Sequence, residues 1–262
     1  MKAYRIAALM VLLLGVGLIV FAGTQLLGAR QIYQEGNIAY EALSNRVKES
    51  AKISPKAAHA SPATFEENTP DDTKMHTIDF ETLKMINKDA AAWLYSPGTV
   101  IDYPIMKADD YSYYLNHLPD GTVNANGSLF IDYNCAADFS DPLTVIYGHH
   151  MKTGKMFGSL KGYKNQKYYE EHPIMYLYTE QGDYQVELVY GCLIGAGQWR
   201  DRAFMCEANL DALMAYAKHN TTFISATAYT EGDRIIALST CSYEFDDARY
   251  VVLGILREMI WQ

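Results

Sequence analysis

Cys241 is the residue of this sequence best placed for nucleophilic chemistry. It ends the run 235–241, whose apolar first half follows a Glu-Gly-Asp turn signal and predicts a buried strand. Arg249 follows the polar loop 242–248 and opens a second β-rich run. A cation beside a thiol lowers its pKa, and the thiolate is the nucleophile. A lone cysteine is otherwise most often a small buried apolar residue, so the case for chemistry also needs a base.

His149 is the candidate base. It follows the predicted strand 142–147 and Gly148, which indicates a sharp exit from that strand. A histidine at a strand end, beside a glycine that admits substrate, is well placed for proton transfer. His150 is the weaker candidate because we expect it to point to the other side. The alternative is that both are ordinary surface loop histidines.

Composition bounds the class of protein. The chain has 262 residues, of which 49% are hydrophobic, so it can form one substantial domain plus appendages. The net charge of −9 excludes a basic nucleic-acid-binding footprint. The four cysteines show no zinc-type spacing, and whether Cys135, Cys192 or Cys206 forms a disulfide stays open. No acidic cluster calls for Ca²⁺, so we expect no metal and no cofactor.

The N-terminal segment predicts a membrane anchor. Residues 6–27 carry no charge, and at about 1.5 Å per residue in a helix they cover roughly 33 Å, enough to span a bilayer. Lys2 and Arg5 precede the span, which favours a cytoplasmic N-terminus and an extracellular catalytic domain. The alternative, a cleaved signal peptide, usually has a shorter apolar region and a small-residue cleavage site.

Three units are expected along the chain: the anchor at 1–30, a stalk and linker at 31–74, and a catalytic domain at 75–262. Residues 31–50 are polar and predict a helix with one apolar face, either a free stalk or a helix lying against the domain. Residues 51–73 contain three Ser-Pro or Thr-Pro pairs and predict a poorly ordered linker.

The catalytic unit is expected to be mainly β. Asp79 can cap a short helix from residue 80, and the clearest helix is predicted at 207–219. Many short runs between these helices favour a closed or nearly closed β-barrel. The predicted strands or extended segments are 91–95, 99–106, 128–132, 142–147, 174–178, 183–194, 235–241 and 250–256.

The motifs around the candidate residues resemble those of sortases. Residues 238–241, Leu-Ser-Thr-Cys, are similar to the TLxTC signature of that family, although Ala237 replaces the usual Thr. Residues 147–149, Tyr-Gly-His, resemble the catalytic histidine motif, and Arg249 sits where the essential arginine falls.

Three further features resemble class B sortases in particular. They are the segment 93–105, the pair Tyr114-Leu115 followed by the block 127–132, and the helix 207–219. The similarity runs from about residue 78 to residue 255. It implies a closed sortase-type barrel of about eight strands, with N-terminal helices and one helix before the last two strands.

The resemblance implies a membrane-anchored cysteine transpeptidase acting on secreted proteins with a C-terminal sorting motif. Cys241 would cleave after Thr through a thioester, and His149 would protonate the leaving amine and deprotonate the incoming one. Arg249 would hold the substrate and stabilise the oxyanion, unless it only forms a surface ion pair with the acidic loop 242–248. Leu115, which is equally compatible with plain core packing, would line the motif groove; the other predicted lining residues are Ser239 and Thr240.

The implied acceptor is an amine of a peptidoglycan precursor. A pilin-polymerising sortase, or a simple cysteine endopeptidase on a β-barrel, is the alternative. A chymotrypsin-like double barrel would need a Gly-rich segment around the cysteine, which is absent, and papain-like enzymes place Cys before His. A non-enzymatic anchored binding domain with a buried Cys241 is the remaining rival.

The acidic side chains after Cys241 favour a mostly neutral catalytic pair. Glu244, Asp246 and Asp247 would raise the pKa of a nearby thiol and oppose Arg249. We therefore expect that only a minor fraction of molecules holds thiolate and imidazolium together at neutral pH. No aspartate is assigned as a third member of the catalytic set.

Overall fold

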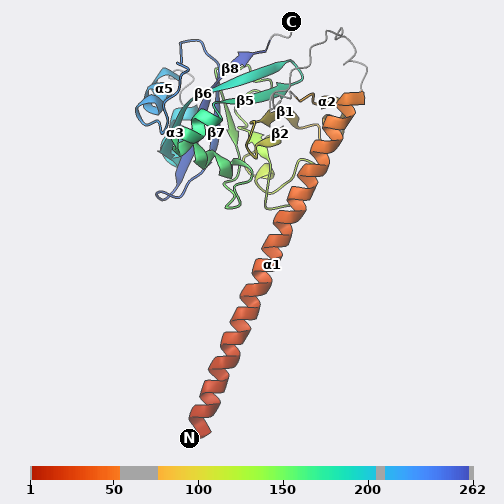
Figure 1. Cartoon of the computed structure of the whole chain (residues 1–262), viewed down its shortest axis with the longest axis vertical. Coiled ribbons are helices and arrows are strands. Elements are labelled where there is room, and N and C mark those ends of the chain that lie inside the picture. The colour runs from red at the N-terminus through yellow and green to blue at the C-terminus, as the bar shows by residue number, and fades with distance from the viewer. Residues whose placement is uncertain (1, 54–75, 205–209, 260–262) are drawn as a thin grey trace, which may run out of the picture.

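The computed structural model describes residues 2–53, 76–204 and 210–259. Helix α1 (Lys2–Ile53) is continuous, so the expected anchor and stalk helices form one element, and its N-terminal half projects away from the globular part (Figure 1). By length and composition α1 qualifies to cross a membrane, with a mean hydropathy of 2.0 in the apolar window of its Leu12–Glu49 stretch. Most of the predicted linker lies outside the described residues.

Eight strands close into a barrel in the order β1-β2-β3-β4-β7-β8-β6-β5, which confirms the fold class expected from the sequence. Pairs β2/β3 and β4/β7 are parallel, and the other neighbours are antiparallel. The strands are β1 (Ala90–Tyr95), β2 (Asp102–Lys107), β3 (Leu129–Ile131), β4 (Leu143–Tyr147), β5 (Ile174–Thr179), β6 (Asp183–Gly195), β7 (Ile235–Cys241) and β8 (Ala248–Glu258).

The helices lie between or before these strands. Asp79 caps α2 (Phe80–Ile86) as predicted, by accepting a hydrogen bond from the Thr82 amide at 3.0 Å. The described part of the expected helix 207–219 is α5 (Leu210–His219). Three elements were not predicted: the 3₁₀ helix η3 (Phe157–Lys164) and the helices α3 (Gln166–Glu171) and α4 (Ala196–Phe204). Their sequences lack a clear helical repeat of apolar positions.

Two groups of buried apolar side chains hold the domain together. The larger fills the barrel and continues under η3, α3 and α5. The smaller covers the outer face of β1 and β2, where Trp93 packs with Leu83 from α2. Val47 of α1 belongs to the smaller group and is fully buried. The C-terminal half of α1 therefore lies against the barrel, which is one of the two arrangements expected for residues 31–50.

Candidate active site

Strand register brings the three predicted catalytic residues to one end of the barrel. β4 and β7 run parallel, and Tyr147 pairs with Ser239 at their carboxyl ends. Two residues further along each chain are His149 and Cys241, so the parallel alignment brings both to the same end of the barrel. Cys241 lies directly opposite Arg249 in the antiparallel pair β7/β8. Directly opposed residues have Cβ atoms about 4.5–5.5 Å apart and share a face of the sheet.

Cys241 is exposed at the end of its strand. The following amide, that of Ser242, donates to the carbonyl of Ala248 at 2.9 Å, which holds the chain as it leaves β7. The other two described cysteines are buried, and burial raises the pKa of Cys135 to about 11 and that of Cys192 to about 12. Cys241 is thus the accessible thiol among the described cysteines, which contradicts the rival in which it is merely buried.

The ring of His149 is held by the loop before β3. Its Nε2 lies 2.7 Å from the carbonyl oxygen of Leu115 in the 3₁₀ helix η2 (Tyr113–Leu115). A carbonyl only accepts, so Nε2 carries the hydrogen, and in the neutral ring Nδ1 holds the lone pair. Nδ1 is therefore the nitrogen that this tautomer offers for proton transfer.

Gly127 is required beside that ring. Its φ is +58°, and a Cβ there would lie 2.7 Å from the carbonyl oxygens of Tyr114 and Leu115 and 3.0 Å from Cδ2 of His149. A side chain at this position would displace either the imidazole or the carbonyl that orients it.

The segment between β4 and His149 is fastened to β7. The amide of Gly148 donates to the carbonyl of Ser239 at 3.2 Å, and Thr240 Oγ1 donates to the carbonyl of Gly148 at 2.7 Å. A Cβ on Gly148 would lie 2.5 Å from Leu129 Cδ2. Glycine therefore allows the chain to pass close to β3, as its position at the strand exit suggested.

His150 lies beside Cys241, although it was expected to point to the other side. Its Nδ1 donates to the backbone carbonyl of Cys241 at 2.8 Å, and its ring meets that of Tyr243 edge to face at 5.2 Å. Burial lowers the pKa of His150. The parallel pairing of β4 and β7 explains the contact, because residues just past the two strand ends remain neighbours.

Arg249 is turned toward the backbone of its own loop. Its Nη1 donates to the carbonyl of Ala248 at 3.0 Å and reaches that of Asp247 at 3.5 Å. Within the described residues, the ion pair of Arg249 with an acidic loop residue, considered as an alternative role, does not form. The guanidinium has five N–H donors, so several remain for a ligand.

A lysine from η3 neutralises one of the acids near Cys241. Lys164 forms an ion pair with Glu244 and donates to Ser242 Oγ at 3.1 Å. Its Nζ also lies 5.0 Å from the centroid of the Tyr250 ring. Hydrogen bonds from Lys164 and Ser242 lower the pKa of Glu244 to about 2. Sequence reasoning missed Lys164, since nothing in the order of residues connects it to the loop 242–248.

The predicted groove residues are placed unequally. Leu115 is half-buried in η2 beside His149, where a groove residue could lie. Ser239 and Thr240 are only 1% and 3% exposed, so their side chains do not line an open groove in this structure. The two side chains point to opposite faces of β7, and both are buried because both faces are covered at these positions. In this structure the backbone carbonyl of Ser239 and the hydroxyl of Thr240 form hydrogen bonds with the backbone of Gly148.

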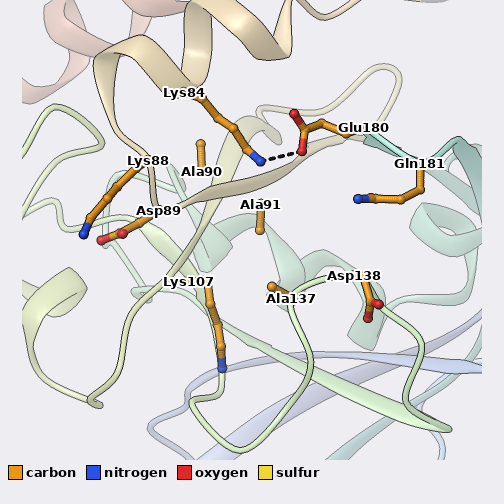
Figure 2. A pocket seen from close by; sticks show the side chains of 10 residues that line it. All are labelled: Lys84, Lys88, Asp89, Ala90, Ala91, Lys107, Ala137, Asp138, Glu180 and Gln181. Atoms are coloured by element: carbon orange, nitrogen blue, oxygen red, sulfur yellow. Dashed lines mark hydrogen bonds and ion pairs between the residues drawn. The ribbon is translucent and has the colours of Figure 1, made fainter.

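A cleft of about 270 Å³ lies at the opposite end of the barrel, near the start of β1 and the β5–β6 turn (Figure 2). Lys84 and Glu180 form an ion pair across it. Asp138, at its edge, precedes β4, whereas His149 follows β4, so the cleft is separate from Cys241. Among residues 2–53, 76–204 and 210–259, no group of three His, Cys, Asp or Glu side chains is arranged to hold a metal ion.

Comparison with known proteins gives one consistent result, although no family model matches the sequence. The chain is 32% identical over 180 residues to Sortase B of Listeria monocytogenes, covering 67% of this chain and 73% of that protein. It is 29% identical over 178 residues to Sortase B of Staphylococcus aureus, with the same two coverages.

Solved structures agree with these sequence relatives. The 2.0 Å crystal structure of Staphylococcus aureus Sortase B has a TM-score of 0.70 and 25% identity, and the match covers 85% of this chain and 99% of that one. A Bacillus anthracis protein described as similar to sortase B has a TM-score of 0.69 and 27% identity, covering 87% and 98%. A Staphylococcus aureus sortase B–substrate complex shares the fold, with a TM-score of 0.71 over 87% of this chain and 98% of that one, at 24% identity.

Proposed function

The chain belongs to the sortase B family of cysteine transpeptidases, and on this premise we propose that it cleaves a C-terminal sorting motif after Thr and joins the protein to an amine of a peptidoglycan precursor. One observation supports the proposal above the others. The exposed Cys241 lies directly opposite Arg249 in the β7/β8 pair, and β4, the parallel neighbour of β7, ends two residues before His149.

The first half-reaction forms a thioester. The sulfur of Cys241 attacks the carbonyl carbon of the Thr residue, and the C–N bond of the scissile peptide breaks. The leaving amine takes a proton from Nδ1 of a protonated His149, while Nε2–H stays bonded to the carbonyl of Leu115. That bond fixes the plane of the imidazole throughout the proton transfer.

The second half-reaction runs in reverse with a new amine. The incoming amine attacks the thioester carbonyl and gives up a proton to His149, and the C–S bond breaks to release the thiolate. An amide bond has replaced an amide bond, so no oxidant, metal or cofactor is required. Water in place of the amine would give simple hydrolysis.

Arg249 supplies positive charge where the oxyanion develops in both halves. Its side chain shares a sheet face with Cys241, and the donors not held by the loop carbonyls can turn toward the substrate. A guanidinium stays charged at all relevant pH values and presents its donors in a fixed plane. A lysine at this position would lack that planar arrangement.

Helix α1 supports a membrane-anchored arrangement. We place its apolar N-terminal half in the membrane as a single span, with the N-terminus cytoplasmic and the catalytic domain extracellular. The span fits the length and hydropathy of α1, and the orientation follows from Lys2 and Arg5 before it. Secreted proteins that are still held at the membrane would then meet the enzyme there.

Cys241→Ala tests the proposal. With a peptide library, with and without an added amine, the variant should lose both cleavage and amine transfer and should keep the wild-type melting temperature. Cys135→Ala, which removes a buried thiol located before β4, is the matched control and should retain both activities. Mass detection of an acyl group on the Cys241 peptide identifies the thioester. Turnover by Cys241→Ala would disprove the assignment, and hydrolysis without amine transfer would identify a protease.

A further inference from the structure

We propose that the C-terminal half of α1, residues 32–48, positions His149 through a hydrogen bond from Tyr40 to Gly127. The proposal rests on the proton-transfer role assigned to His149 above. It gives this part of the helix a function in the reaction in addition to its connection with the apolar N-terminal half.

The helix and the loop before β3 are in close contact. Asn124 Nδ2 donates to the carbonyl of Ile32 at 3.0 Å, and Asn126 Nδ2 donates to the carbonyl of Tyr33 at 3.3 Å. Gly36 follows about one helical turn after these contacts, and a Cβ there would lie 2.2 Å from Asn126 Nδ2. The helix has room for nothing larger than glycine at this point, so its distance from the loop is tightly set.

Tyr40, one helical turn further on, reaches the backbone of the same loop. Its side chain is 7% exposed, and its hydroxyl donates to the carbonyl of Gly127 at 2.6 Å. The ring packs edge to face on Tyr103 of β2, with centroids 5.1 Å apart. The barrel wall therefore fixes the ring, and the hydroxyl in turn fixes Gly127.

Gly127 is the residue against which His149 is seated. A Cβ on it would lie 3.0 Å from Cδ2 of the imidazole and 2.7 Å from the carbonyl oxygen of Leu115, the group that accepts from Nε2. The next amide, of Ser128, donates to the carbonyl of Tyr114 at 2.8 Å, which joins this stretch to η2. A movement of Gly127 would therefore alter both the space for the ring and the carbonyl that orients it.

A second attachment holds α1 further along. Lys48 Nζ lies 2.6 Å from Asp102 Oδ2, and Trp93 Nε1 donates to Asp102 Oδ1 at 2.7 Å. The two attachments are on one uninterrupted helix, in its C-terminal half, which lies beside the barrel (Figure 1). Tyr40 thus lies between two points at which the helix is attached to the domain. A single point of attachment would fix its position less firmly.

Tyr40→Phe in the full-length chain is the direct test, because it removes the hydroxyl and keeps the ring. Misplacing a catalytic group by 1 Å can cost about a hundredfold in rate, and a smaller shift of a still-packed ring is expected to lower kcat about tenfold with little change in KM. The NMR signal of the His149 Nε2 proton should also shift and exchange faster. Ile38→Ala, at an exposed position of the same helix, is the control and should change neither quantity.

Gly36→Ala is the second variant. It leaves Tyr40 intact but pushes the helix from the loop, while alanine favours the helix itself by about 1 kcal/mol. It should reproduce the fall in kcat and the change in the His149 signal. Wild-type kcat and an unchanged His149 signal in a folded Tyr40→Phe or Gly36→Ala variant would overturn the positioning role. Turnover by His149→Ala would instead refute the proposed function, so the two failures are distinguishable.

Discussion

The charge on Lys164 is expected to set how reactive Cys241 is. Lys164 pairs with Glu244 and lies 3.1 Å from Ser242 Oγ, one residue from the nucleophile. Lys164→Met keeps most of the aliphatic side chain but leaves Glu244 without its counter-ion. Both the lost positive charge and the exposed negative charge raise the free energy of a thiolate nearby, so Cys241 should react more slowly as a nucleophile.

The size of the effect follows from Coulomb's law. Glu244 lies three positions after Cys241, which puts its charge on the order of 10 Å from the sulfur. A unit charge at that distance changes the ionisation free energy by about 0.4 kcal/mol at a dielectric constant of 80 and about 1.7 kcal/mol at 20. The Glu244 side chain is 40% exposed, so solvent screening favours the smaller of these two free-energy changes. That change corresponds to about a two- to threefold loss of thiolate.

The assay is the rate of alkylation of Cys241 between pH 6 and 9, followed by mass spectrometry of its peptide. Lys164→Met should slow alkylation about two- to threefold at the lower end of this pH range, in line with that loss of thiolate. Glu244→Gln should accelerate it, because Lys164 is then unpaired, and the double variant should fall near wild type. If Lys164 acted only as a clamp on the loop 242–248, both single variants would slow alkylation, and that result would refute the electrostatic reasoning.

Three other outcomes are expected. Asp102→Ala should destabilise the domain by about 2–3 kcal/mol in urea unfolding, because it leaves the buried indole N–H of Trp93 unpaired; a loss below 0.5 kcal/mol would contradict this. The depressed pKa of Glu244, about 2, means that its pair with Lys164 contributes stability above the ordinary pKa of 4.5 and loses it as the pH falls toward 2. The stability gap between wild type and Glu244→Gln should therefore close over that range, and a constant gap would show that the pair does not titrate. Adding EDTA should leave turnover unchanged, and a fall would disprove metal independence.

Local patterns in the sequence were sufficient to predict most of the fold. The run 235–241 is apolar enough to identify a buried strand, and the predicted segments 174–178 and 183–194 match β5 and β6, which pair with each other. The Asp79 cap needs only a neighbour three residues away. Each of these features depends on contacts within a few residues, which is the range over which composition and spacing carry information.

Contacts between distant segments were not predictable in the same way. The position of His150 depends on the parallel pairing of β4 with β7, and the contact of Tyr40 with Gly127 joins positions 87 residues apart. Burial of Ser239 and Thr240 depends on what covers β7 from both sides. A motif gives the order of residue types but not the packing above and below a strand, so the roles of these groups required coordinates.

The parallel pairing of β4 with β7 accounts for much of the site. Parallel neighbours cannot be joined by a tight turn and need a long crossover connection; here it runs from residue 148 to residue 234 and includes η3. This connection allows β7 to pair with β4, so that Cys241, the last residue of β7, lies at the same end of the barrel as His149. It also delivers Lys164, at the end of η3, back to the acidic loop that follows the nucleophile. A change in this connection that moves Lys164 should therefore alter the reactivity of a thiol 77 positions away.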